Sequence, residues 1–174
     1  GVGGGGGNAV TRMFDAQIKG VDFIAINTDA QDLHHVKAQS KLHIGKNLTR
    51  GLGAGMNPDI GRQAAEENRD EIQDVLKGAD LVFITCGLGG GTGSGASSVI
   101  ADAAHDVGAL VVAVVTKPFS FEGKKRSVIA EEALLSLRDR VDTLITIPND
   151  KVLNLIDKNT SIVGAFTIID DILK

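Results

Sequence analysis

The sequence LVFITCGLGGGTGSG at residues 81–95 joins a predicted strand to a glycine-rich loop. Six glycines fall within the nine residues Gly87–Gly95. Ordering a glycine costs roughly 0.5–1 kcal/mol more than ordering an alanine, and a bare connection would need only one or two. The density therefore favours a nest of backbone N–H groups around an anion, to which Thr92 and Ser94 can add hydroxyl donors. The alternative is a simple tight turn.

A second glycine-rich run, GVGGGGGN, occupies residues 1–8 and contains G-x-G-x-x-G at Gly1, Gly3 and Gly6. A helix beginning near Asn8 would aim its free N–H groups and its positive dipole end at a bound anion. The pattern alone is weak, because the strand that should precede it cannot be checked. A flexible terminal linker is the alternative. We also expect truncation at both ends: a first strand is missing, and the helix that starts at Ser161 is incomplete.

Strand-length apolar runs alternate with helical patterns along the chain. Strands are predicted at residues 23–26, 41–44, 81–85, 109–115 and 143–147, and helices at 8–18, 58–76, 97–107 and 124–138. Asn57-Pro58 is a helix start signal, and Gly78 is a stop signal. The alternation predicts a three-layer, Rossmann-like α/β fold with a mostly parallel sheet and helices on both faces. Ligands of such sheets bind at the carboxyl ends of the strands, where the second glycine run lies.

Composition excludes several classes of protein. The length of 174 residues suits one domain. The net charge of −4 and the lack of Trp and Tyr argue against a nucleic-acid binder. The uncharged stretch 81–101 is too rich in glycine for a lipid-facing helix, and one cysteine, Cys86, fits a reducing compartment, so we expect a cytoplasmic protein without membrane insertion. Neither glycine run ends in the Lys of a P-loop.

Seven residues of the loop, Gly89–Gly95, match the tubulin signature G-G-G-T-G-[ST]-G. The wider chain resembles the tubulin/FtsZ family, the tubulin-like cell-division GTPases. Motifs in the family's order carry the resemblance over nearly the whole chain, at residues 3–10, 27–31, 48–55, 118–123, 147–150 and 157–160.

The resemblance implies that residues 1–174 are a GTP-binding domain that takes GTP or GDP with Mg²⁺. It implies a partner of the same kind, in a head-to-tail homopolymer at the division septum, and contacts to division-ring and membrane-tether proteins through other segments. The family's catalytic acids lie on a loop after the last helix and act on the nucleotide of the neighbouring subunit. The chain alone would then bind GTP but hydrolyse it negligibly. No catalytic residue and no metal ligand is assigned within it.

Site residues follow from the same resemblance, motif by motif. Gly4, Gly5, Gly6, Gly7 and Asn8 would face the α/β-phosphates, and Gly91, Thr92 and Gly93 would hold the β/γ end. Asn27, Asp29 and Gly90 belong to the same nucleotide-binding set. The loop 51–57, with Gly55 and Met56, would close over the γ-phosphate. Glu122 and Arg126 would meet the ribose and nearby groups. Asn149, Phe166 and Asp170 would read and stack on guanine.

The residue types suit these roles, and simpler structural interpretations of the same residues remain open. A carboxylate at Asp170 can accept hydrogen bonds from N1–H and N2–H of guanine, a donor pair that adenine lacks. Phe166 lies four residues earlier, on the same helical face. Asp170 and Asp171 could instead be a solvated face, Phe166 plain core, and Glu122 with Arg126 a helical ion pair.

Three departures from the family pattern bear on these assignments. Residues 96–98 are Ala-Ser-Ser where the family has Ala-Ala-Pro, so the helix there can start differently. Met56 stands where a small residue is common, and Gly164 can loosen the base-binding helix.

Three functions stay open on sequence alone. The leading hypothesis is an assembly GTPase domain. The second is a dinucleotide-binding oxidoreductase domain, in which Asp29 would hold a ribose but the second glycine loop would have no role. The third is a tubulin-like scaffold that binds nucleotide without hydrolysing it.

Overall fold

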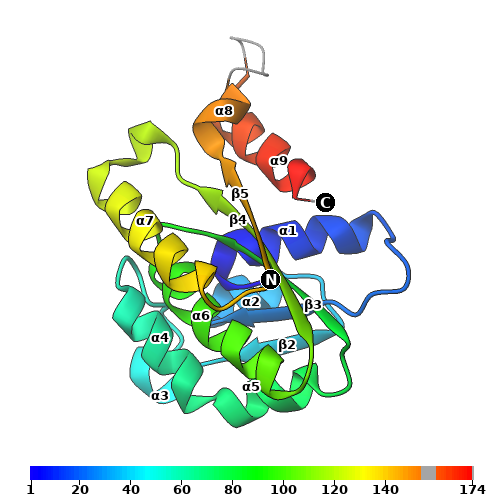
Figure 1. Ribbon diagram of the computed structural model, residues 1–174. Helices are drawn as coiled ribbons and strands as arrows, with labels where there is room; N and C mark the ends of the chain where they lie inside the picture. Colours follow the sequence, from blue (N-terminus) through cyan, green and yellow to red (C-terminus); the bar gives the residue numbers. More distant parts are fainter. Residues whose placement is uncertain (154–159, 174) are drawn as a thin grey trace.

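The computed structural model describes residues 1–153 and 160–173 and shows a parallel α/β fold (Figure 1). Strands β3 (Leu81–Gly87), β4 (Leu110–Lys117) and β5 (Thr143–Pro148) pair in parallel in that order. Strands β1 (Ile24–Asn27) and β2 (Ser40–His43) form a second parallel pair. Val2 bridges to both Ile26 and Cys86, so it links the two groups of strands. The predicted parallel sheet is confirmed.

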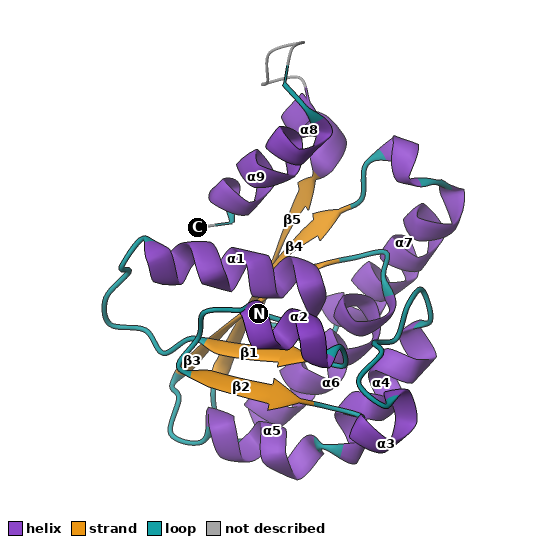
Figure 2. Cartoon of the chain, turned by 180° about the vertical axis from the view of Figure 1, so that it is seen from behind, coloured by secondary structure: helices purple, strands orange, loops and turns teal. Residues whose placement is uncertain are grey.

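Helices cover both faces of the strands (Figure 2). On one side, α6 (Gly91–Asp106) packs against α4 (Pro58–Glu67), α5 (Arg69–Leu76) and α7 (Lys124–Arg138). On the other, α1 (Gly3–Asp15) packs on β3 and β1 and against α9 (Ile162–Ile172). Shorter helices are α2 (Ala30–His35), α3 (Lys46–Thr49), α8 (Asn149–Leu153) and the 3-10 turn η1 (Ser120–Glu122).

The main core lies between the strands and α6. It joins alternate residues of β4, namely Val111, Ala113 and Val115, to the small side chains of α6. Alanine-rich helices allow close approach to a sheet, so α6 is almost wholly buried. A smaller cluster around Phe119, Val152 and Ile169 holds α9 and α8 together at the carboxyl end of β5.

Helix boundaries differ from the sequence prediction at the two glycine runs. Helix α1 begins at Gly3 rather than Asn8, and α6 begins at Gly91 rather than Ser97. The first run is thus a helical turn and not a flexible linker. The predicted helix 58–76 is two helices separated at Asn68, whose side-chain Oδ1 accepts a hydrogen bond from Gly45 N at 2.8 Å. None of the helices in the described ranges is both long and apolar enough to cross a membrane.

Candidate functional site: two helix N-termini around one cavity

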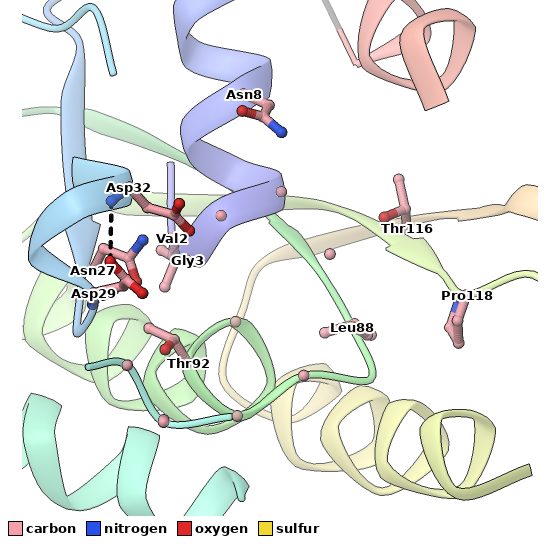
Figure 3. A pocket seen from close by; sticks show the side chains of 18 of the residues that line it. Val2, Gly3, Asn8, Asn27, Asp29, Asp32, Leu88, Thr92, Thr116 and Pro118 are labelled. Carbon is pink, nitrogen blue, oxygen red and sulfur yellow. Dashed lines mark hydrogen bonds between the residues drawn. The ribbon is translucent and has the colours of Figure 1, made fainter. Parts of the chain in front are cut away.

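Both glycine runs place a helix N-terminus at the same point (Figure 3). Val2 precedes α1 and Gly90 precedes α6, both with extended backbone and neither with a side-chain cap. A side chain on Gly3 would come within 3.1 Å of Gly93 N, so the two first turns are in direct contact. Each helix leaves its first N–H groups without intrahelical partners and carries a positive dipole end. Together they form a concave anion site built from backbone.

A cavity of about 500 Å³ opens over these two turns. Small-molecule sites span roughly 300–1,000 Å³. The lining comes from the ends of the strands, from the loop before α4 and from six helices, namely α1, α2, α6, α7, α8 and α9. It includes fifteen of the residues that the sequence assigned: Gly4, Gly5, Asn8, Asn27, Asp29, Gly55, Gly90, Gly91, Thr92, Gly93, Glu122, Arg126, Asn149, Phe166 and Asp170.

Three assigned residues lie outside that lining: Gly6, Gly7 and Met56. The helix turns Gly6 and Gly7 away from the cavity, toward the strands and α2. A side chain on Gly6 would overlap Thr85 O, and one on Gly7 would lie 2.7 Å from Val36 Cγ2. These two glycines therefore allow α1 to pack closely, which is a different task from contact with a ligand.

Short polar contacts fix the end of the cavity at the first turn of α6. The hydroxyls of Thr28 and Thr92 are 2.6 Å apart and buried, so they tie the end of β1 to the first turn of α6. Gly91 N donates to Gly55 O at 2.7 Å, which fastens the 51–57 loop to the same turn. Asp29 caps α2 by accepting from Asp32 N at 3.0 Å. The loop is thereby held where its residues 52–55 line the cavity.

A buried acceptor without a partner marks the other end. Asn149 begins α8, is buried, and its Oδ1 has no hydrogen-bond partner among the described residues. Phe166 on α9 is 39% exposed and meets Phe119 edge-on, with ring centroids 5.1 Å apart. Phe166 is thus neither plain core nor fully solvated. A buried orphan acceptor beside a half-open ring is suited to a planar polar ligand.

Asp170 completes this end from the same face of α9. Its side chain is only 17% exposed, and its Oδ2 accepts from Nε of Arg12 on α1 at 3.3 Å. Burial raises the pKa of Asp170 above its ordinary value of 3.8, and the neighbouring Arg12 opposes that rise. The reading of Asp170 and Asp171 as a freely solvated face therefore fails for Asp170, whereas Asp171 is exposed.

Glu122 and Arg126 line the wall between the two ends. They form an i,i+4 ion pair, with Nη1 2.8 Å from Oε2. The pair spans the junction of η1 and α7 at Gly123, whereas the simpler interpretation of the sequence placed it within one helix. Glu122 Oε1 also accepts from Phe119 N at 2.8 Å, which closes the η1 turn. The pair has a structural task and still presents polar atoms to the cavity.

Sequence reasoning missed several lining residues: Asp32, Leu88, Thr116, Pro118, Ile169 and Leu173. The positions of some of these residues within the predicted strands and helices could have indicated them. Thr116 and Pro118 stand at the carboxyl end of β4, where ligands of parallel sheets bind. Ile169 and Leu173 follow Phe166 at helical spacing. Asp32 carries no sequence signal of its own, and residues 157–159 of the last family motif lie outside the described residues.

Comparison with known proteins agrees with this geometry. The model of the Tubulin/FtsZ family, GTPase domain, matches residues 1–157. An empty FtsZ dimer from M. jannaschii is 50% identical, with a TM-score of 0.96 over 99% of this chain and 50% of that one. CetZ2 of Haloferax volcanii, a protofilament with bound GTPγS, is 27% identical, with a TM-score of 0.89 over 99% of this chain and 54% of that one.

CetZ1 of the same organism, a GDP-bound monomer, is 26% identical, with a TM-score of 0.87 over 99% of this chain and 56% of that one. The chain thus spans about half the length of the solved structures it resembles. The family match decides against the dinucleotide-binding oxidoreductase. The chain belongs to the tubulin/FtsZ family, as part of its GTPase domain.

Proposed function

We propose that the cavity binds GTP and GDP, with the phosphates against the first turns of α1 and α6 and the base against α8 and α9. The observation that carries this proposal is the contact between the two helix N-termini at Gly3 and Gly93. Two uncapped dipoles aimed at one point favour a multiply charged anion over a neutral ligand.

Residues of this chain would divide the work along the cavity. Gly4, Gly5, Gly90 and Gly93 leave their backbone bare, so phosphate oxygens can approach their N–H groups. Thr92 adds a hydroxyl that Thr28 orients. The loop carrying Gly55 covers the γ-phosphate end. When bound, Mg²⁺ would neutralise phosphate charge while keeping mostly water and phosphate ligands.

Base selection would rest on Asn149 and Asp170. The orphan Oδ1 of Asn149 can accept from a base N–H, and the carboxylate of Asp170 can accept from N1–H and N2–H of guanine. Adenine offers no such donor pair, so the lone pairs of this largely buried carboxylate that Arg12 does not use would lack donors from the base, which is unfavourable. Phe166 would stack on the base.

We further propose that the parent protein assembles head to tail and hydrolyses GTP at the contact between subunits, as a division-ring filament. Support comes from the relatives, of which one is an FtsZ dimer and another a GTPγS-bound protofilament. A non-hydrolysing scaffold is the competing function. Light scattering with simultaneous phosphate release separates them: scattering that rises equally with GTP and GDP, without phosphate release, would favour the scaffold.

Binding itself is tested by thermal shift with GTP, GDP, ATP and NAD⁺. A ligand at one hundred times its Kd adds about 2.7 kcal/mol, which for a domain of this size raises Tm by about 5–10 °C. We expect that rise with GTP and GDP and little change with ATP or NAD⁺. Equal shifts with ATP would contradict the assignment of Asn149 and Asp170 to guanine.

A further inference from the structure

Helix α1 also reaches the base end of the cavity, through an arginine that does not line the cavity. Arg12 lies nine residues after Gly3, or about 13.5 Å along the helix. Its Nε donates to Oδ2 of Asp170 at 3.3 Å, and its Nη1 donates to Oδ1 of Asp171 at 3.3 Å. Figures 1 and 2 both show α1 and α9 side by side. One helix thus meets the phosphate end with its first turn and the base end with its last.

Burial and Arg12 act in opposite directions on the ionisation of Asp170. Its side chain is largely buried and faces the cavity. Burial favours the neutral carboxylic acid, which has a proton on one oxygen and can no longer accept hydrogen bonds on both. Arg12 works in the opposite direction, because its guanidinium stays charged at any ordinary pH.

The geometry leaves the carboxylate free to bind a ligand as well. Each carboxylate oxygen has two lone pairs, so Oδ2 can accept from Arg12 and still accept from a base. The second contact, to Asp171, pins the guanidinium across two adjacent residues of α9. Arg12 and Asp171 are the charged groups that act on Asp170 within the described part of the chain, and Asp171 by itself would disfavour ionisation.

We propose that Arg12 is a positioning residue for guanine recognition, which acts through Asp170 by fixing the orientation and the charge of the carboxylate that reads the base. The inference rests on the proposed function and adds a residue on the opposite side of Asp170 from the ligand. Helix α1 would then contribute to both ends of the cavity, with its first turn at the phosphate end and Arg12 at the base end.

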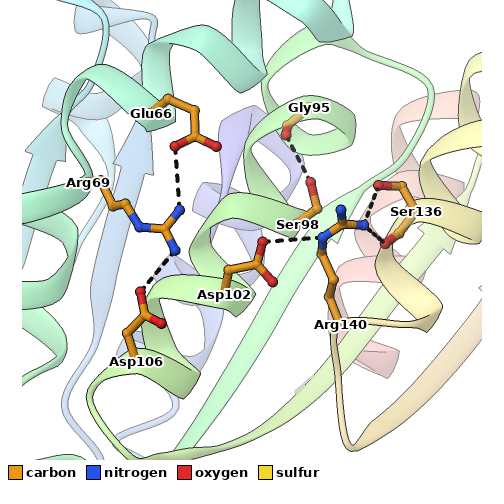
Figure 4. Close-up of polar contacts among 8 residues, drawn as sticks. All are labelled: Glu66, Arg69, Gly95, Ser98, Asp102, Asp106, Ser136 and Arg140. Carbon is orange, nitrogen blue, oxygen red and sulfur yellow. Dashed lines mark hydrogen bonds and ion pairs between the residues drawn. The ribbon is translucent and has the colours of Figure 1, made fainter.

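The competing explanation is an ordinary ion pair that only fastens α1 to α9. Such pairs contribute about 0–1 kcal/mol to stability when exposed. The chain offers a matched control in Arg140, whose Nε is 3.2 Å from Asp102 Oδ2 on the α6–α7 side of the molecule (Figure 4). Arg140 is about as exposed as Arg12, at 42% against 32%, and also does not line the cavity.

The test measures affinity for GTP and for inosine triphosphate, which lacks the N2 amino group, at pH 7.5 and pH 5.5. Wild type, Arg12→Ala, Arg12→Lys and Arg140→Ala are compared as full chains by competition with a fluorescent GTP analogue. For Arg12→Ala we expect GTP affinity to fall about tenfold and the preference for GTP over inosine triphosphate to shrink at least about threefold. The loss should deepen at pH 5.5, as the unopposed carboxyl takes up its proton.

Arg12→Lys restores a charge at the same place and should recover most of the affinity and most of the preference. Arg140→Ala should match wild type within about twofold. Arg12→Ala behaving like Arg140→Ala overturns the inference and leaves the proposed function intact. An equal loss for both nucleotides at both pH values, without rescue by lysine, shows a merely structural pair and also overturns it. A wild type whose thermal shift with ATP equals those with GTP and GDP overturns the proposed function itself.

Discussion

Gly95, the last glycine of the signature, is buried in α6 and lies outside the residues that line the cavity. A Cβ added there would overlap the carbonyl oxygen of Pro58 and lie 2.7 Å from Arg62 N. Both obstacles belong to the backbone of α4, which no rotamer change can move. The substitution Gly95→Ala must therefore push α4 and α6 apart.

The magnitude follows from two opposing effects. Overpacking a tight core costs about 1–3 kcal/mol, and rigid backbone obstacles place this case at the upper end. Alanine recovers about 1 kcal/mol of helix propensity relative to glycine. The net loss is about 2 kcal/mol, which lowers Tm by about 4–8 °C for a domain of this size. Urea unfolding followed by circular dichroism is the suitable assay, because the chain has no Trp or Tyr for fluorescence.

Gly90→Ala is the matched control within the same loop. The nearest atom to its added Cβ is Gly55 O at 3.9 Å, and its φ of −99° suits alanine. Stability should change by less than about 0.5 kcal/mol, whereas GTP affinity should fall because the methyl group enters the cavity. A Gly95→Ala variant as stable as wild type would refute the argument that this glycine serves helix packing.

Three further predictions concern single side chains. Asn149→Leu should leave the ligand-free protein as stable as wild type or more so, because it removes a buried acceptor without a partner, while GTP affinity falls about tenfold; equal affinity would contradict its base-reading role. Burial raises the pKa of the Cys86 thiol to about 11, so a thiol reagent at pH 8 should modify Cys86 only after unfolding in guanidinium. The Val111 amide, then His105, lower the pKa of Asp142 below 3.8, so this carboxylate stabilises the fold above about pH 4 and ceases to as pH falls through its lowered pKa. In Asp142→Asn, Tm should therefore change less between pH 5 and pH 3 than in wild type, and identical slopes would refute the linkage.

Apolar periodicity and capping signals correctly predicted the helices and strands that depend mainly on interactions between residues near in sequence. Helix α7 has the predicted bounds 124–138, and Asn57 caps α4 with its side chain at 3.1 Å from Asp59 N, as its sequence position indicated. The five strands lie where the apolar runs stand. The largest boundary errors fall at Gly3, Gly91 and Asn68, and the short helices α2, α3 and α8 were not predicted. The low helix propensity of glycine argues against a helix in a glycine run. Only contacts with segments distant in sequence reveal that α1 and α6 begin within the two glycine runs.

The sequence predicted those parts of the candidate site that carry a recognisable sequence motif. Glycine density and strand ends indicated the two helix N-termini at the cavity, and family motifs indicated Asn149 and Asp170, which line the same cavity. Arg12 escaped because its partner lies 158 residues away in sequence and no local pattern marks it. Residues that act through another side chain are visible only once two distant helices are seen together.

The glycine density itself has two causes, and they depend on each other. Gly90 lines the cavity, and a Cβ there would have Gly55 O at 3.9 Å as its nearest neighbour, whereas Gly93 and Gly95 let α6 lie against the carbonyls of Gly87 on β3 and Pro58 on α4. The packing of α6 on α4 also positions the N-terminus of α6, because Gly91 N donates a hydrogen bond to Gly55 O in the loop that leads into α4. An anion site made of helix ends must be held by helices that cannot slide. The close packing that looks purely structural is therefore what aims the amides at one point.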